Sequence, residues 1–198
     1  MVRIFGLIVA LAALMAPAQA ALLTYSFDSD ASGAVSPASA GTAANFAGNG
    51  GVDAANSRWA TSGLSNGRIN TFSFTAGSPG VAISDLVVNA RRGSGPNGAQ
   101  IELFYNVGAT DQGVNGTFLG TNTISTTSTP FTYNVGVNLL AGEKINFTIR
   151  STKFGSFTGV ALFDDVTLDG NVVPEPTSMA VFGLLGAGIA ARRIRRKA

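Results

Sequence analysis

The chain has 198 residues, a formal net charge of +2 at pH 7, and neither cysteine nor histidine. Without these residues, disulfides, Ser-His-Asp and Cys-His catalysis, and metal sites built on Cys or His ligands are excluded. The positive charge comes from the two ends, because residues 21–173 contain seven Lys and Arg against ten Asp and Glu, a net charge of −3. No basic stripe remains in this body, so nucleic-acid binding is not expected.

The first 20 residues have the pattern of a secretory signal peptide. Arg3 precedes an apolar run over residues 4–16, and small residues at Ala18 and Ala20 close the segment. The pattern predicts a signal helix over residues 1–20, recognised by signal peptidase and cleaved so that Ala21 becomes the new N-terminus. The alternative, a buried first helix, requires a polar face that residues 4–16 lack.

The body, residues 21–171, reads as one domain made of short strands. Apolar and polar residues alternate over residues 23–27, 69–74, 101–105 and 145–149, as in half-buried antiparallel strands. Further strands are expected at residues 81–90, 117–124, 131–139, 157–163 and 166–168. Gly-rich and Asn-rich turns separate them. The sequence therefore predicts an all-β antiparallel β-sandwich, a jelly roll of about nine strands.

Residues 28–65 lack this alternation and are predicted to form a long loop or an irregular first layer. The segment contains Trp59, the single tryptophan of the chain. An indole on a sandwich loop can stack on a sugar ring, which makes Trp59 a ligand-binding candidate. The alternative is that Trp59 fills an edge of the core.

No catalytic residues and no cofactor are predicted. Two carboxylates suffice for a glycosidase, so an extracellular glycan-processing enzyme is the competing hypothesis. Glu102 and Glu143 are the only glutamates of the body, however, and both are expected to be solvated acids, on a polar strand face and in a Gly turn.

Residues 172–198 combine three features in a fixed order. Pro174-Glu175-Pro176 is expected to be exposed and extended, because each proline lacks an amide donor and disfavours helix in the residue before it. An apolar run over residues 179–191 follows and predicts a short transmembrane helix. Five basic residues then place the terminus on the cytoplasmic side; they are Arg192, Arg193, Arg195, Arg196 and Lys197.

This order of motif, apolar segment and basic tail resembles the PEP-CTERM sorting signal of exported bacterial proteins. The resemblance implies that the protein waits in the inner membrane until an exosortase cleaves near the triplet. The body then passes to the cell surface or extracellular matrix. Members of the family are commonly linked to exopolysaccharide and biofilm, so a polysaccharide partner is implied too. The alternative is an uncleaved tail anchor that keeps the body facing the periplasm.

The body also resembles the jelly-roll, carbohydrate-binding-like domains found between such signals. The residues that carry this resemblance are Tyr25-Ser26-Phe27-Asp28, Arg92-Gly93-Ser94-Gly95-Pro96 and Asp164-Asp165-Val166-Thr167-Leu168-Asp169-Gly170. In related modules an acid in the first strand and one in the last hold a structural calcium, and Asp28 and Asp165 are the matching positions. The alternative is that these acids only end strands and cap turns, since calcium needs six or more oxygen ligands.

Overall fold

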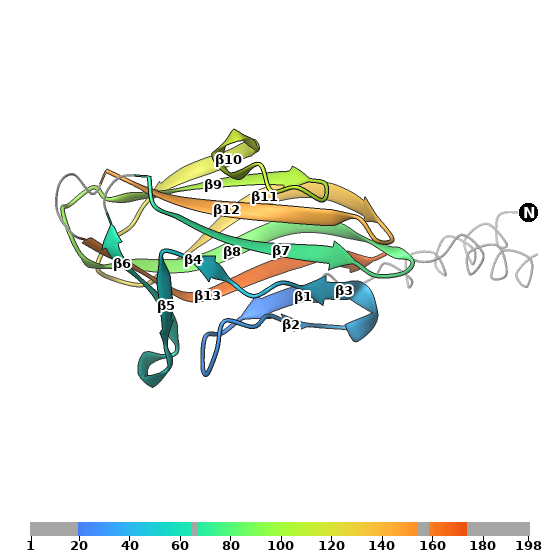
Figure 1. The fold of residues 1–198 in the computed structure, drawn as a ribbon, viewed down its shortest axis with the longest axis horizontal. Coiled ribbons are helices and arrows are strands. Elements are labelled where there is room, and N and C mark those ends of the chain that lie inside the picture. The colour runs from blue at the N-terminus through green and yellow to red at the C-terminus, as the bar shows by residue number, and fades with distance from the viewer. Residues whose placement is uncertain (1–19, 65–66, 154–158, 174–198) are drawn as a thin grey trace, which may run out of the picture.

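The computed structural model describes residues 20–64, 67–153 and 159–173, and these form an all-β sandwich (Figure 1). The only helical elements in this part of the chain are three 3-10 turns, η1 (Ala38–Ala40), η2 (Ala54–Asn56) and η3 (Gly113–Asn115). Nine strands have six or more residues: β1 (Ala20–Tyr25), β6 (Arg58–Leu64), β7 (Ile69–Ala76), β8 (Gly80–Ser94), β9 (Gln100–Val107), β10 (Thr117–Thr123), β11 (Thr129–Leu140), β12 (Lys144–Thr152) and β13 (Gly159–Val172). Four strands are shorter: β2 (Ala34–Val35), β3 (Gly41–Ala43), β4 (Ala47–Gly48) and β5 (Gly50–Asp53).

The strand order is that of a jelly roll. Strands β6 to β13 form two facing sheets, with the order β6-β13-β8-β11 in one and β7-β12-β9-β10 in the other. All of these pairs are antiparallel, and the chain crosses repeatedly between the sheets as it passes from β6 to β13. The predicted all-β antiparallel sandwich is confirmed.

Strand β13 pairs with two different strands along one of its sides. Its first part, residues 159–163, pairs with β6, and its second part, residues 166–170, pairs with β1. Ala20 is the register partner of Gly170, so the first and last described strands lie side by side. Both therefore leave the sandwich at the same end, on the right in Figure 1.

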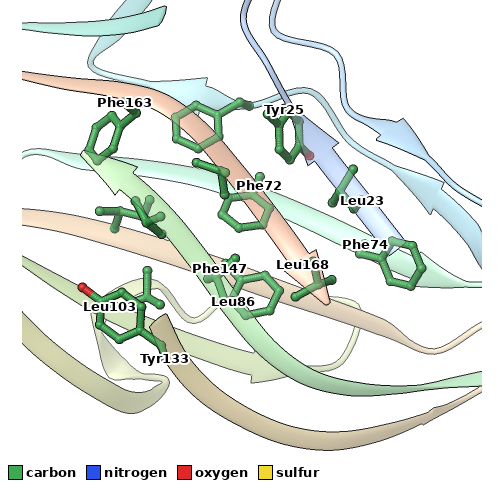
Figure 2. Close-up of a cluster of buried hydrophobic side chains, with 14 of the residues drawn as sticks. Leu23, Tyr25, Phe72, Phe74, Leu86, Leu103, Tyr133, Phe147, Phe163 and Leu168 are labelled. Carbon is green, nitrogen blue, oxygen red and sulfur yellow. The ribbon is translucent and has the colours of Figure 1, made fainter. Parts of the chain in front are cut away.

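The core lies between the two sheets and is rich in aromatic rings. Phe72 of β7 stacks on Phe147 of β12 with ring centroids 4.9 Å apart. Leu86 of β8 and Leu168 of β13 are fully buried from the other sheet, and Figure 2 shows these side chains between the ribbons. This arrangement follows from the period of two along each strand, which sends alternate side chains inward.

Two details differ from the sequence prediction. The strand expected at residues 157–163 is described from Gly159 onward, and it is continuous with the one expected at residues 166–168. Together they form β13, whose register shifts between Phe163 and Asp165. The segment 28–65 is an irregular layer, as expected, but it also contributes β6 to the main sheet. Residues 1–19 and 174–198, which hold the expected signal helix and transmembrane helix, lie outside the described residues. None of the helices within the described residues is long and apolar enough to cross a membrane.

Candidate functional site

Trp59 is a core residue. Its side chain is 5% exposed, and its ring packs on Phe46 and Phe27 with centroids 5.1 and 6.1 Å away. The indole Nε1 donates a hydrogen bond to Oδ1 of Asn70 at 3.1 Å, which satisfies its one polar group inside the sandwich. Trp59 therefore packs in the core, as the alternative to sugar binding predicted. A buried indole has no open face on which a sugar ring can stack.

Asp28 and Asp165 lie within electrostatic reach of each other. Burial is the main cause that raises the pKa of Asp165, and the charges of Asp164 and Asp28 raise it further, against a hydrogen bond from Asn89. Hydrogen bonds from Ser57 and Ser26 instead lower the pKa of Asp28. Across the described ranges, no group of three or more acidic side chains is arranged to hold a metal ion. Asp28 lies three residues after the end of β1 and Asp165 lies inside β13, and a calcium ion held by these two acids stays a prediction.

A different group of residues stands out on the outer face of the β10-β9-β12-β7 sheet. We call Glu102, Phe104, Phe118 and Arg150 the Phe118 patch. The ring of Phe118 is 55% exposed and lies 5.3 Å from the ring of Phe104, its register partner on β9. The Arg150 guanidinium lies 5.1 Å from the centre of the Phe104 ring, within cation-π distance.

Glu102 completes the Phe118 patch through an ion pair. Arg150 Nε donates to Glu102 Oε2 at 2.7 Å, and a second guanidinium nitrogen lies 2.5 Å from the same oxygen. Glu102 is the register partner of Arg150, so neighbouring strands hold the pair in place. The expectation of a freely solvated Glu102 is wrong, because its carboxylate is half-buried and neutralised by Arg150. Glu143 is exposed, and its Oε2 accepts the Leu140 N–H at 2.8 Å in the predicted turn.

The alternation of β9 explains why the patch forms here. Ile101 and Leu103 point into the core and are fully buried, so Glu102 and Phe104 point outward. Phe104 is nevertheless only 6% exposed, because Phe118 and Arg150 cover its ring. The Phe118 patch was not predicted from the sequence. The sequence does contain one signal for it, because Phe104 is a phenylalanine at an outward position of an alternating strand.

The connection between β9 and β10 lies over the same sheet face. The Asn106 side chain donates to the carbonyl of Thr110 at 2.8 Å and accepts the Gln112 N–H at 3.0 Å. Asn146 of β12 donates to the carbonyl of Gly108 at 2.9 Å. The loop, with η3, therefore packs on β9 and β12, and leaves the Phe118 patch as the aromatic part of this face that solvent reaches.

The patch combines groups that suit a neutral sugar. An exposed ring can cover the apolar face of a pyranose, while the guanidinium offers donors and the carboxylate offers acceptors to hydroxyl groups. The net charge of the Arg150–Glu102 pair is zero, so the patch favours no ionic ligand.

The residues of the predicted sorting and cleavage sites lie at or beyond the ends of the described chain. Ala18, Pro174, Glu175, Pro176 and the basic cluster from Arg192 to Lys197 are outside the described residues. Ala20 and Ala21 begin β1, are exposed, and pair with Gly170 and Asp169. The last described residue, Val173, donates its N–H to the carbonyl of Gly80 at 3.0 Å.

Comparison with known families finds the PEP-CTERM protein-sorting motif at residues 172–197. The match begins at the last residue of β13 and covers the predicted triplet, apolar run and basic cluster. This motif indicates an exported protein that is sorted to the cell surface.

Solved structures with a similar fold include carbohydrate-binding modules. BiXyn10A CBM1 in its apo form is 11% identical, with 75% of this chain and 96% of that chain covered and a TM-score of 0.45. A family 29 carbohydrate-binding module is 8% identical, with 82% and 98% covered and a TM-score of 0.43. A family two carbohydrate esterase from Cellvibrio japonicus is 14% identical over 67% of this chain, which spans only 32% of the esterase, with a TM-score of 0.41. No curated protein matches the sequence.

Proposed function

We propose that this protein is a precursor that an exosortase processes for display on the bacterial surface or in the extracellular matrix. The observation that carries the proposal is the sorting motif at residues 172–197, which begins where the last strand of the sandwich ends. In this proposal residues 1–20 are removed by signal peptidase, residues 21–171 are the displayed domain, and residues 172–198 hold the protein transiently in the inner membrane.

The displayed domain acts in this proposal as a non-catalytic module that contacts polysaccharide through the Phe118 patch. Its exposed ring and neutral Arg150–Glu102 pair support a sugar ligand rather than an ionic one. Glu102 is engaged by Arg150 and Glu143 by the backbone of its own turn, which supports a structural role for both glutamates.

Mass spectrometry of the protein from its native envelope tests the processing. We expect an N-terminus at Ala21 and no peptides beyond about Pro176 in the surface fraction. Peptides that extend through Arg196 in that fraction would contradict exosortase cleavage and favour the uncleaved tail anchor.

Binding to exopolysaccharide from the native envelope, measured by affinity electrophoresis, tests the ligand. Phe118→Ala should weaken binding about tenfold, equivalent to about 1.4 kcal/mol, because it removes the exposed ring. Leu140→Ala is the matched control, since Leu140 is 70% exposed at the end of β11, which belongs to the other sheet. Equal binding by both variants would exclude the Phe118 patch.

Hydrolysis of the same polysaccharide tests the non-catalytic role. We expect no hydrolysis by the native protein or by the double variant Glu102→Gln, Glu143→Gln. A glycosidase that uses these carboxylates would instead hydrolyse the polysaccharide and lose several orders of magnitude of activity in the double variant.

A further inference from the structure

The first and the last described residues lie at the same end of the sandwich. Ala20 starts β1 beside Gly170, and Val173 is bound through its N–H to Gly80. Gly80 in turn pairs with Leu140, the last residue of β11. We call this the tether end; besides Ala20 and Val173 it contains the turns at residues 77–80, 107–108 and 140–144. Figure 1 shows β1 and β13 reaching this end together.

The tether end exposes apolar side chains and carries little charge. Five large apolar residues are exposed within the described ranges, and three of them lie here: Val107 at 42%, Leu140 at 70% and Val173 at 39%. The turns place them together, because Gly108 donates its N–H to Lys144 and Glu143 donates its own to Leu140. Glu143 and Lys144 carry the only charged side chains in the segments that form this end, and the proposed cleavage after Ala20 adds the α-amino group of Ala21.

The distance to the expected membrane segment is short. Five residues separate Val173 from the apolar run that begins at Met179. Met179 is therefore six residue steps from Val173, and a fully extended chain of six steps spans at most about 22 Å. While residues 179–191 sit in the bilayer, as the proposed function requires, the tether end therefore cannot move far from the lipid surface.

We infer that the tether end rests on the lipid bilayer while the chain is anchored, with Leu140 inserted at the interface. This inference rests on the proposed function. A few apolar side chains give only weak membrane binding on their own. The anchor raises their effective concentration at the surface. Cleavage near Pro174-Glu175-Pro176 removes that advantage, so the contact ends when the body is released.

Site-specific fluorescence in vesicles tests this contact. The chain contains no cysteine, so Leu140→Cys accepts a single bimane label. The protein with its C-terminal segment intact is reconstituted in phosphatidylcholine and phosphatidylglycerol vesicles, with or without doxyl-labelled lipid. Thr129→Cys is the matched control, because exposed Thr129 begins the same strand about 36 Å away at roughly 3.3 Å per residue. We expect doxyl lipid to quench the Leu140 label at least threefold more than the Thr129 label.

Vesicle flotation separates failure of the inference from failure of the proposed function. Protein that does not float with the vesicles contradicts the membrane anchor, and the inference falls with it. Protein that floats but shows equal quenching at both labels overturns the inference alone. Disulfide-linked dimers of Leu140→Cys without lipid quenching would assign the tether end to a second copy and also overturn it.

Discussion

The Trp59 indole is held by aromatic packing and by its hydrogen bond to Asn70. Trp59→Ala removes both and leaves a cavity among Phe27, Phe46 and Asn70. We expect the free energy of unfolding to fall by about 3 to 5 kcal/mol. Urea unfolding followed by circular dichroism measures the change, since the variant has no tryptophan to report by fluorescence.

Phe118→Ala is the control for Trp59→Ala. Its ring is more than half exposed, so truncation leaves little cavity, and a surface change of this kind is expected to cost about 0.5 kcal/mol or less. A Trp59→Ala variant as stable as Phe118→Ala would contradict the core role of the indole.

Asp165 gives a prediction about pH. Burial is the main cause that raises its pKa in the folded protein above the ordinary value of 3.8. The folded state therefore binds more protons than the unfolded state between these two values, and the free energy of unfolding falls as pH rises through this interval. Asp165→Asn removes the ionisation and should stabilise the protein more at pH 7 than at pH 3. Urea unfolding at both pH values, followed by Trp59 fluorescence, measures this difference; a variant that gains more at pH 3 would contradict it.

At the level of residues, the sequence allowed some environments to be predicted and not others. The inward positions of β9 and β12 follow from alternation alone, because the period of a strand is fixed. The ion pair of Glu102 with Arg150 depends on the register between β9 and β12, whose residues are 48 positions apart. Register of this kind is set by the whole sheet, so the Phe118 patch could not be derived from local pattern.

At the level of elements, Gly170 permits β13 to lie between β1 and β8. A Cβ atom at this position would come within 2.2 Å of the Ala82 carbonyl oxygen and 2.7 Å of Leu22 Cδ1. Gly170→Ala should therefore push these strands apart and lower the free energy of unfolding by about 1 to 3 kcal/mol. Urea unfolding measures the loss.

Gly51→Ala is the matched control on β5, because nothing lies within 4 Å of a Cβ atom placed there. This variant should be neutral or slightly stabilised, since alanine restricts the unfolded chain. If both variants lost the same free energy of unfolding, crowding at β13 would not be the cause of the loss in Gly170→Ala.

Strands with strong alternation, such as β7 and β12, were predicted close to their observed positions. Strand β6 was missed because its sequence, RWATSGL, is built mostly from small and polar residues. It becomes a strand by pairing with the first part of β13 on one edge and with β5 on the other. Tertiary pairing outweighs weak local preference here.

At the level of the whole molecule, the charge of the chain is divided between its ends and its body. The full chain has a formal net charge of +2, whereas residues 21–173 have −3. Six of the thirteen basic residues lie in the two terminal segments, against one acid, Glu175. Removal of both segments therefore reverses the sign of the net charge while leaving the sandwich intact.

This reversal would make the two proposed processing steps visible by isoelectric focusing. Loss of residues 1–20 removes only Arg3, so the intermediate should focus close to the precursor, whose isoelectric point is about 9.3. Loss of the segment after the Pro174-Glu175-Pro176 motif removes five basic residues and should move the protein to the acidic side. We expect surface protein at an acidic position and membrane protein at a basic one.

Replacement of Pro174 and Pro176 by alanine should trap the basic form in the membrane fraction, if the exosortase recognises an extended motif. A surface pool that stays basic would show that the C-terminal segment is retained, and an unchanged acidic pool in the proline variant would show that the extended triplet is not what the enzyme reads.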